Sequence, residues 1–137
     1  MQKNQRMKCF VVATLCLMLL FSITACGKGP VYLVEEQSCF LDFTVDGETV
    51  EFRCHLCIQN ELSNPQKVSL TGHFSEDMEA GLIQEESLLA SDPEVPESTT
   101  FLLQPGLNTL DVVFTGTFGG NHQKQDRLLP EISIEIH

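Results

Sequence analysis

An Asp-Gly pair, Asp46-Gly47, lies between two stretches of alternating apolar and polar residues and constrains this chain most. Both residues tolerate the positive φ of a two-residue turn, so the pair is a strong hairpin signal. Successive side chains of a strand face opposite ways, and apolar residues at every second position therefore mark one buried face. These positions are Cys39, Leu41, Phe43 and Val45 before the pair, and Val50, Phe52, Cys54, Leu56 and Ile58 after it. The pattern predicts an antiparallel hairpin with one face in the core.

Short apolar stretches separated by turn residues continue through the rest of the chain. We expect strands at 67–74, 99–103, 110–118 and 130–136, and one helical turn at 75–81 that begins at Ser75 and ends at Gly81. The segment 82–90 fits a strand or a short helix equally well. This spacing favours an all-β fold, a single immunoglobulin-like β-sandwich of about seven strands with at most one short helical turn. The expectation concerns architecture only, because the chain has no tryptophan, the residue that marks antibody-type domains.

The first 26 residues carry the signals of export. Lys3, Arg6 and Lys8 precede an uncharged apolar run at 10–23, which is shorter than the roughly 20 residues of a bilayer span and suits a signal peptide. The run ends in Ile23-Thr24-Ala25-Cys26, a segment that resembles the lipobox of bacterial lipoproteins. The resemblance implies cleavage before Cys26 and attachment of a diacylglyceryl group to its sulfur. The alternatives are an ordinary signal peptide and an N-terminal anchor helix.

The resemblance also implies a domain organisation and a location. Residues 1–25 would form the signal peptide, 26–36 a lipidated tether, and 37–137 the β-sandwich domain. Each buried methylene contributes about 0.8 kcal/mol, so a diacyl anchor holds the protein stably at a membrane. We therefore expect a bacterial cell-membrane protein whose domain lies on the extracytoplasmic side. Gly27 leaves open which membrane carries it.

The part of the chain after the leader is strongly acidic. Five basic and nineteen acidic residues follow residue 25, which corresponds to a formal net charge of −14. A nucleic-acid partner is disfavoured, because phosphate binding requires a basic surface. The acidic residues crowd between 76 and 97, a span without Lys or Arg, and this charge serves either solubility or a cationic protein or peptide partner. The candidate partner-binding residues are Glu85, Glu86, Glu94 and Glu97.

Three cysteines follow the lipobox, and the hairpin suggests what two of them do. A two-residue turn at Asp46-Gly47 places Cys39 directly opposite Cys54, at a separation that a disulfide accepts, so a Cys39–Cys54 disulfide is predicted. A four-residue turn would instead pair Cys39 with Leu56 and leave the two cysteines diagonal. Without the bond, both would be small buried apolar residues. Cys57 faces the opposite side of the strand from Cys54, next to His55. A dithiol redox centre sits at a helix N-terminus, which is missing here, and the cysteines and histidines show no metal-site spacing.

No motif of a known catalytic site occurs in the chain, so we expect no enzyme and no cofactor. The prediction is a membrane-anchored extracytoplasmic lipoprotein with a non-catalytic binding role. One alternative is an envelope thiol–disulfide or metal-handling protein that uses Cys54, His55 and Cys57. Another is an immunity-type lipoprotein that neutralises a cationic exported toxin. Lys124 and Arg127, in a polar stretch after Gly119 and Gly120, are expected to form ion pairs with the acidic surface.

Overall fold

The computed structural model of the chain describes residues 29–123 and 127–137. The predicted signal peptide, the lipobox with Cys26, and Lys124 lie outside the described residues. The elements in chain order are β1 (Val31–Leu33), η1 (Glu35–Gln37), β2 (Cys39–Asp46), β3 (Thr49–Asn60), β4 (Gln66–His73), α2 (Ser75–Glu79), β5 (Ser87–Ser91), β6 (Phe101–Leu103), β7 (Gly106–Thr117) and β8 (Glu131–Ile136). The predicted all-β fold with one short helical turn is confirmed.

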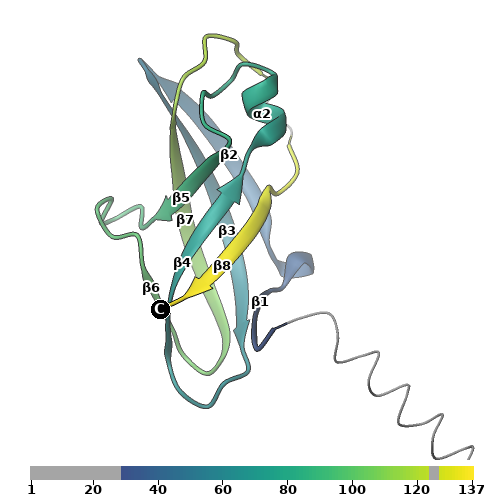
Figure 1. The fold of residues 1–137 in the computed structure, drawn as a ribbon, viewed down its shortest axis with the longest axis vertical. Helices are drawn as coiled ribbons and strands as arrows, with labels where there is room; N and C mark the ends of the chain where they lie inside the picture. The colour runs from purple at the N-terminus through teal and green to yellow at the C-terminus, as the bar shows by residue number, and fades with distance from the viewer. Residues whose placement is uncertain (1–28, 124–126) are drawn as a thin grey trace, which may run out of the picture.

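The strands form two antiparallel layers that share β5 (Figure 1). In one layer, β3 pairs with β7 along its whole length. The other edge of β3 pairs first with β2 and then, toward its C-terminal end, with β1. In the second layer, β4 pairs with β8 on one side and with β5 and β6 on the other. Strand β5 also pairs with β7 and so connects the layers at one corner. The opposite edge of the sandwich, between β2 and β8, is not closed by strand pairing among the described residues.

The predicted hairpin forms, and its inner face supplies much of the core. Gly47 has a φ of +60°, which is the left-handed conformation that the turn requires. Phe52 stacks on Phe74 with ring centroids 4.5 Å apart, and Phe74 meets the edge of Phe114 at 5.4 Å. Gly72 makes this aromatic cluster possible, because a Cβ there would lie 2.7 Å from the Phe74 ring.

The register of the hairpin differs from the prediction from the turn onward. Asp46 pairs with Thr49, so the two turn residues are Gly47 and Glu48, and β3 is displaced by two residues relative to a turn at Asp46-Gly47. A β-bulge between Phe40 and Asp42 adds one residue to β2, so that Cys39 lies opposite His55 and Phe40 opposite Cys54. The extra residue reverses which side chains face the core. Phe40 packs against the core, whereas Leu41 is 53% exposed. The prediction that Cys39 and Leu41 face inward is therefore wrong. The predicted pairing of Cys39 with Cys54 is also wrong, because the turn at Gly47-Glu48 would place Cys39 opposite Leu56 even without the bulge.

Three smaller expectations are also resolved. Val31–Leu33, within the predicted tether 26–36, pairs with β3, so the folded domain begins before residue 37. Helix α2 ends before Gly81, whose φ of +79° stops the helix as predicted. Ser75 is not its N-cap, because Phe74 holds that position and makes no side-chain cap. The ambiguous segment 82–90 is irregular at first and becomes β5 from Ser87.

Candidate functional site

The three described cysteines, Cys39, Cys54 and Cys57, are free thiols, and no disulfide joins them. The argument for a Cys39–Cys54 bond rested on a turn at Asp46-Gly47. The observed turn at Gly47-Glu48, together with the bulge between Phe40 and Asp42, places Cys39 opposite His55 instead. Cys54 is wholly buried inside the sandwich, and Cys39 is exposed. Burial, together with the nearby Cys39, raises the pKa of the Cys54 thiol to about 12. A thiol of this kind stays protonated at neutral pH and is a poor nucleophile.

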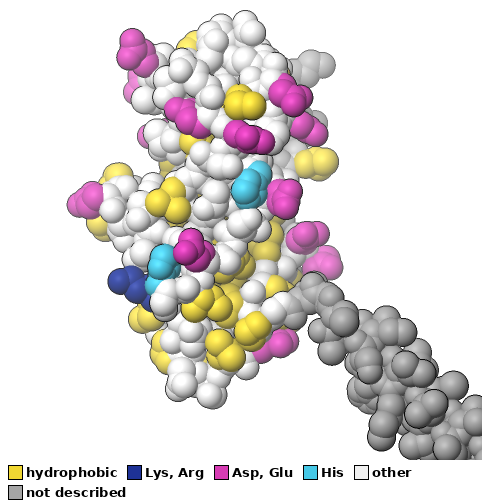
Figure 2. Space-filling model, in the orientation of Figure 1, with side chains coloured by type: hydrophobic (Ala, Val, Ile, Leu, Met, Phe, Trp, Pro, Cys, Tyr) yellow, Lys and Arg dark blue, Asp and Glu magenta, His cyan; other side chains and the backbone are white. Residues whose placement is uncertain are grey.

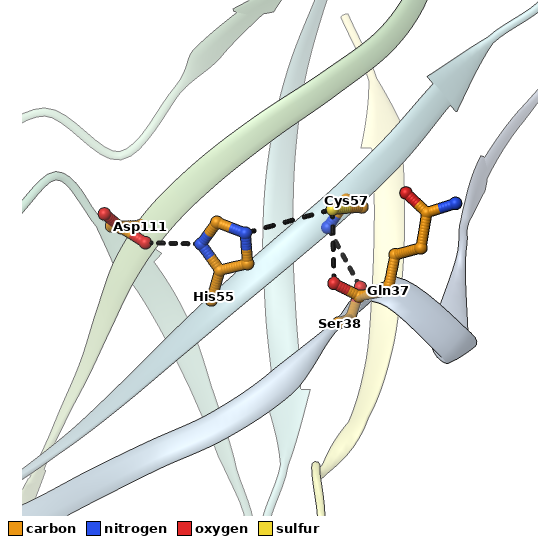
Figure 3. Close-up of polar contacts among 5 residues, drawn as sticks. All are labelled: Gln37, Ser38, His55, Cys57 and Asp111. Carbon is orange, nitrogen blue, oxygen red and sulfur yellow. Dashed lines mark hydrogen bonds and ion pairs between the residues drawn. The ribbon is translucent and has the colours of Figure 1, made fainter.

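Cys57 belongs to a polar chain on the outer face of β3 (Figure 3). Its sulfur lies 3.9 Å from His55 Nε2, and His55 Nδ1 lies 2.7 Å from Asp111 Oδ1 on β7. This order, a thiol, an imidazole and a carboxylate, is also the order of a nucleophilic catalytic triad. However, the Cys57 thiol donates a hydrogen bond to the Gln37 carbonyl at 3.2 Å, and the Cys57 residue is only 3% exposed.

The same contacts explain why Cys57 is covered. The backbone N–H of Cys57 donates to Ser38 Oγ at 2.9 Å, and the N–H of Val34 donates to the Cys57 carbonyl at 2.8 Å. The segment around η1 is thereby fastened over this part of β3, and substrate has no access to the sulfur. Within the described ranges, no three side chains of His, Cys, Asp or Glu come together in an arrangement that could hold a metal ion. The geometry assigns Cys57, His55 and Asp111 a structural role.

The four predicted partner-binding glutamates lie in two segments, one on each side of β5 in the chain. Glu85 and Glu86 precede β5, whereas Glu94 and Glu97 lie in the loop after it (Figure 1). Glu85 accepts hydrogen bonds from the backbone N–H of Thr117 at 2.8 Å and from its hydroxyl at 2.6 Å. Burial raises the pKa of Glu85, but the hydrogen bonds from Thr117, together with backbone N–H groups at Glu85 and Gln84, outweigh it and leave this pKa below its ordinary value. Glu85 therefore fastens β7 to the segment before β5.

A cleft opens at the edge of the sandwich between β2 and β8. It has a volume of about 520 Å³, within the range of small-ligand sites. Phe40 and Phe52 form one wall from the first layer, and Phe74 with the start of α2 forms another. The segment 127–131, which leads into β8, completes the lining. A second hollow of about 570 Å³ shares Leu128, Leu129, Pro130 and Glu131 and reaches Leu33 of β1.

Arg127 occupies the inner part of this cleft. Its guanidinium forms an ion pair with Asp77 of α2 and lies 5.5 Å from the ring centroid of Phe43 and 5.7 Å from that of Phe52. Burial lowers the pKa of Arg127, and the charge of nearby Glu76 acts in the opposite direction. The expectation that Arg127 forms an ion pair with the acidic stretch 76–97 is confirmed.

Most residues of the cleft could not be assigned from the sequence. Phe40 appeared on the polar side of its strand, and only the bulge turns it inward. Phe74 and Glu131 come from elements far apart in the sequence, and no motif joins them. Arg127 is the exception, because two of the five basic residues after residue 25 lie in its segment, while the span 76–97 has eight acidic residues and no Lys or Arg.

Comparisons with protein-family models, with curated proteins and with solved structures found no match to this chain. Over residues 29–123 and 127–137, no helix has the length and apolar character needed to cross a membrane.

Proposed function

We propose that this chain is a lipid-anchored extracytoplasmic protein of bacteria whose β-sandwich domain binds a partner and catalyses no reaction. The anchor rests on the order of the leader, in which a basic start, an apolar run and Ile23-Thr24-Ala25-Cys26 follow one another. The binding role rests on the cleft between β2 and β8, a concave surface with aromatic walls and charged groups at its rim. This cleft is the single structural observation that carries the proposal.

The chemistry of the side chains supports binding more than catalysis. Within the described residues, the cleft contains no cysteine, and its histidine, His73, has both ring nitrogens hydrogen-bonded to Ser87 and Ser133. The thiol–disulfide alternative has little support, because Cys54 and Cys57 face opposite sides of β3 and both are buried. The immunity-type role, in which the domain neutralises a cationic exported toxin, remains a second candidate because the chain after residue 25 has a formal charge of −14.

The anchor is tested by metabolic labelling with radioactive palmitate. Wild-type protein should be labelled and should sediment with membranes, whereas Cys26→Ala should carry no label and should be released or remain unprocessed. Cys39→Ala is the matched control, since Cys39 is an exposed thiol whose loss should leave labelling unchanged. Labelling and membrane association of Cys26→Ala at the wild-type level would refute the lipid anchor.

A further inference from the structure

Arg127 shows within the chain itself how this cleft accommodates a cation. Its guanidinium lies over the faces of Phe43 and Phe52 and meets the carboxylate of Asp77. Aromatic faces attract cations through the negative potential above the ring, and a carboxylate in a partly desolvated site adds to this attraction. The inner part of the cleft is therefore a cation site, and the chain's own arginine fills it.

The outer part of the cleft has similar chemistry, and among the described residues no cation fills it. Glu76 and Glu131 line it, and neither side chain forms an ion pair with another described residue. Arg127 is matched by Asp77, so these two carboxylates leave the cleft with an excess of negative charge. Phe40 and Phe74 supply aromatic surface beside them. A group that complements this lining has a positive charge at the end of an apolar stem, as the side chains of lysine and arginine do.

The shape of the edge favours a polypeptide over a free small cation. The second hollow continues the cleft past Leu128 and Pro130 to Leu33, so the two together extend beyond one side chain. Leu128 is 92% exposed at the junction, where an apolar residue of a bound chain would cover it. In Figure 2, acidic side chains gather around the α2 end of the molecule, while the visible Lys and Arg side chains lie near the C-terminus. An approaching basic segment would be steered toward the α2 end.

We propose that the cleft binds a basic segment of a partner protein by inserting a lysine or arginine side chain between Phe40, Phe74 and the carboxylates of Glu76 and Glu131. The inference rests on the proposed binding function and adds the chemical class of the partner. The partner segment is recognised by its inserted cationic side chain and by an adjacent apolar residue, which packs on Leu128 and in the second hollow. The glutamates of the loop after β5, Glu94 and Glu97, are outside this site.

The test measures fluorescence anisotropy of a short labelled peptide of alternating arginine and leucine, with full-length protein in nonionic detergent. Wild type should bind this peptide, and the same peptide with citrulline in place of arginine should bind at least about tenfold more weakly. Changing Glu76→Gln and Glu131→Gln together should weaken binding about tenfold or more. Phe40→Leu, which keeps an apolar side chain but removes the ring, should also weaken it.

The matched control is Glu94→Gln with Glu97→Gln, which removes the same charge from the loop outside the cleft. Its affinity should change less than about twofold, because exposed charges beyond a Debye length act weakly. Equal losses in the two double variants would mean attraction by overall charge only and would overturn the site. Equal binding of the citrulline peptide, or no binding by wild type, would also overturn it. Neither result would affect palmitate labelling at Cys26, so the lipid anchor and the peptide site in the cleft are tested independently.

Discussion

Two arginine–aspartate pairs occur in this domain, and they differ chiefly in their surroundings. Arg53 and Asp42 lie on the outer face of the β2–β3 hairpin, joined by two bonds of 2.6 and 2.8 Å, with side chains 50% and 43% exposed. Arg127 and Asp77 meet at the open edge, with side chains 18% and 11% exposed. If one member of the outer pair is removed, water can solvate the other. Water reaches the inner pair poorly.

The contribution of an arginine–aspartate pair to stability therefore depends on how exposed the pair is to solvent. An exposed ion pair gains little, because each partner is nearly as well solvated alone. Removing one partner of a buried pair leaves an uncompensated charge in a poorly solvated place, which is strongly unfavourable. The thiols repeat this contrast, since Cys39 is exposed and Cys54 is wholly buried. Each prediction below tests this difference between the outer face and the interior.

The largest effect is expected for the inner ion pair. Asp77→Ala should lower the free energy of unfolding by about 3 kcal/mol, the lower end of the range for broken buried pairs, because Arg127 keeps some exposure. Urea unfolding followed by circular dichroism measures the change. The double variant Asp77→Leu with Arg127→Met should recover most of the stability, since apolar groups of similar size need no partner. If the single variant is as stable as wild type, the inner pair behaves like the outer one and the contrast fails.

The buried thiol of Cys54 should react far more slowly than the exposed thiol of Cys39. Because the pKa of Cys54 is about 12, its thiolate fraction at pH 8 is about a thousandfold below that of an ordinary thiol. Iodoacetamide should modify Cys39 first and Cys54 far more slowly, as measured by peptide mass spectrometry over time. Cys57, covered by the η1 segment, should also lag behind Cys39. Fast modification of Cys54 in folded protein would contradict its burial.

An intermediate case is Glu85, which is partly exposed but accepts two hydrogen bonds from Thr117. Its lowered pKa means that its ionised form stabilises the fold above the ordinary carboxyl pKa of about 4.3. The stabilisation is lost as pH falls through the lowered folded-state pKa. Glu85→Gln should cost less than about 1 kcal/mol at pH 7. The difference from wild type should shrink below pH 4, and a difference that is constant from pH 7 to pH 3 would exclude this role.

The smallest effect is expected for the outer ion pair. Arg53→Ala should leave the urea midpoint almost unchanged, because water solvates Asp42 once its partner is gone. Any residual loss should decrease in high salt, which screens exposed charges. Asp42→Ala removes the other partner and should also leave the urea midpoint almost unchanged. A loss comparable with that of Asp77→Ala would show that exposure does not govern the two pairs.

The sequence predicted those parts of the fold that depend on neighbouring residues. The sequence showed the presence of a hairpin at Gly47, the inward face from Val50 to Ile58 and the stop at Gly81, because each rests on local backbone conformation or on a period of two. The bulge at Leu41 was not readable, since the apolar alternation around Cys39 and Leu41 fits an unbroken strand equally well. The exact turn residues were not readable either, since the turn is Gly47-Glu48, and this displacement removes the predicted Cys39–Cys54 pairing.

For the candidate site, the sequence by itself determined the supply of charge: an acidic chain after residue 25, a stretch at 76–97 without Lys or Arg, and two of the five basic residues, Lys124 and Arg127, in one later segment. Tertiary structure alone decided that Phe40 turns inward and that Phe74, Glu76 and Glu131 share one cleft with Arg127. The physical reason is that charge and periodicity are properties of a segment. Burial, by contrast, is settled by competition among side chains from distant segments for the same space. Phe40 fills the space at the open edge, and Leu41 is left in solvent.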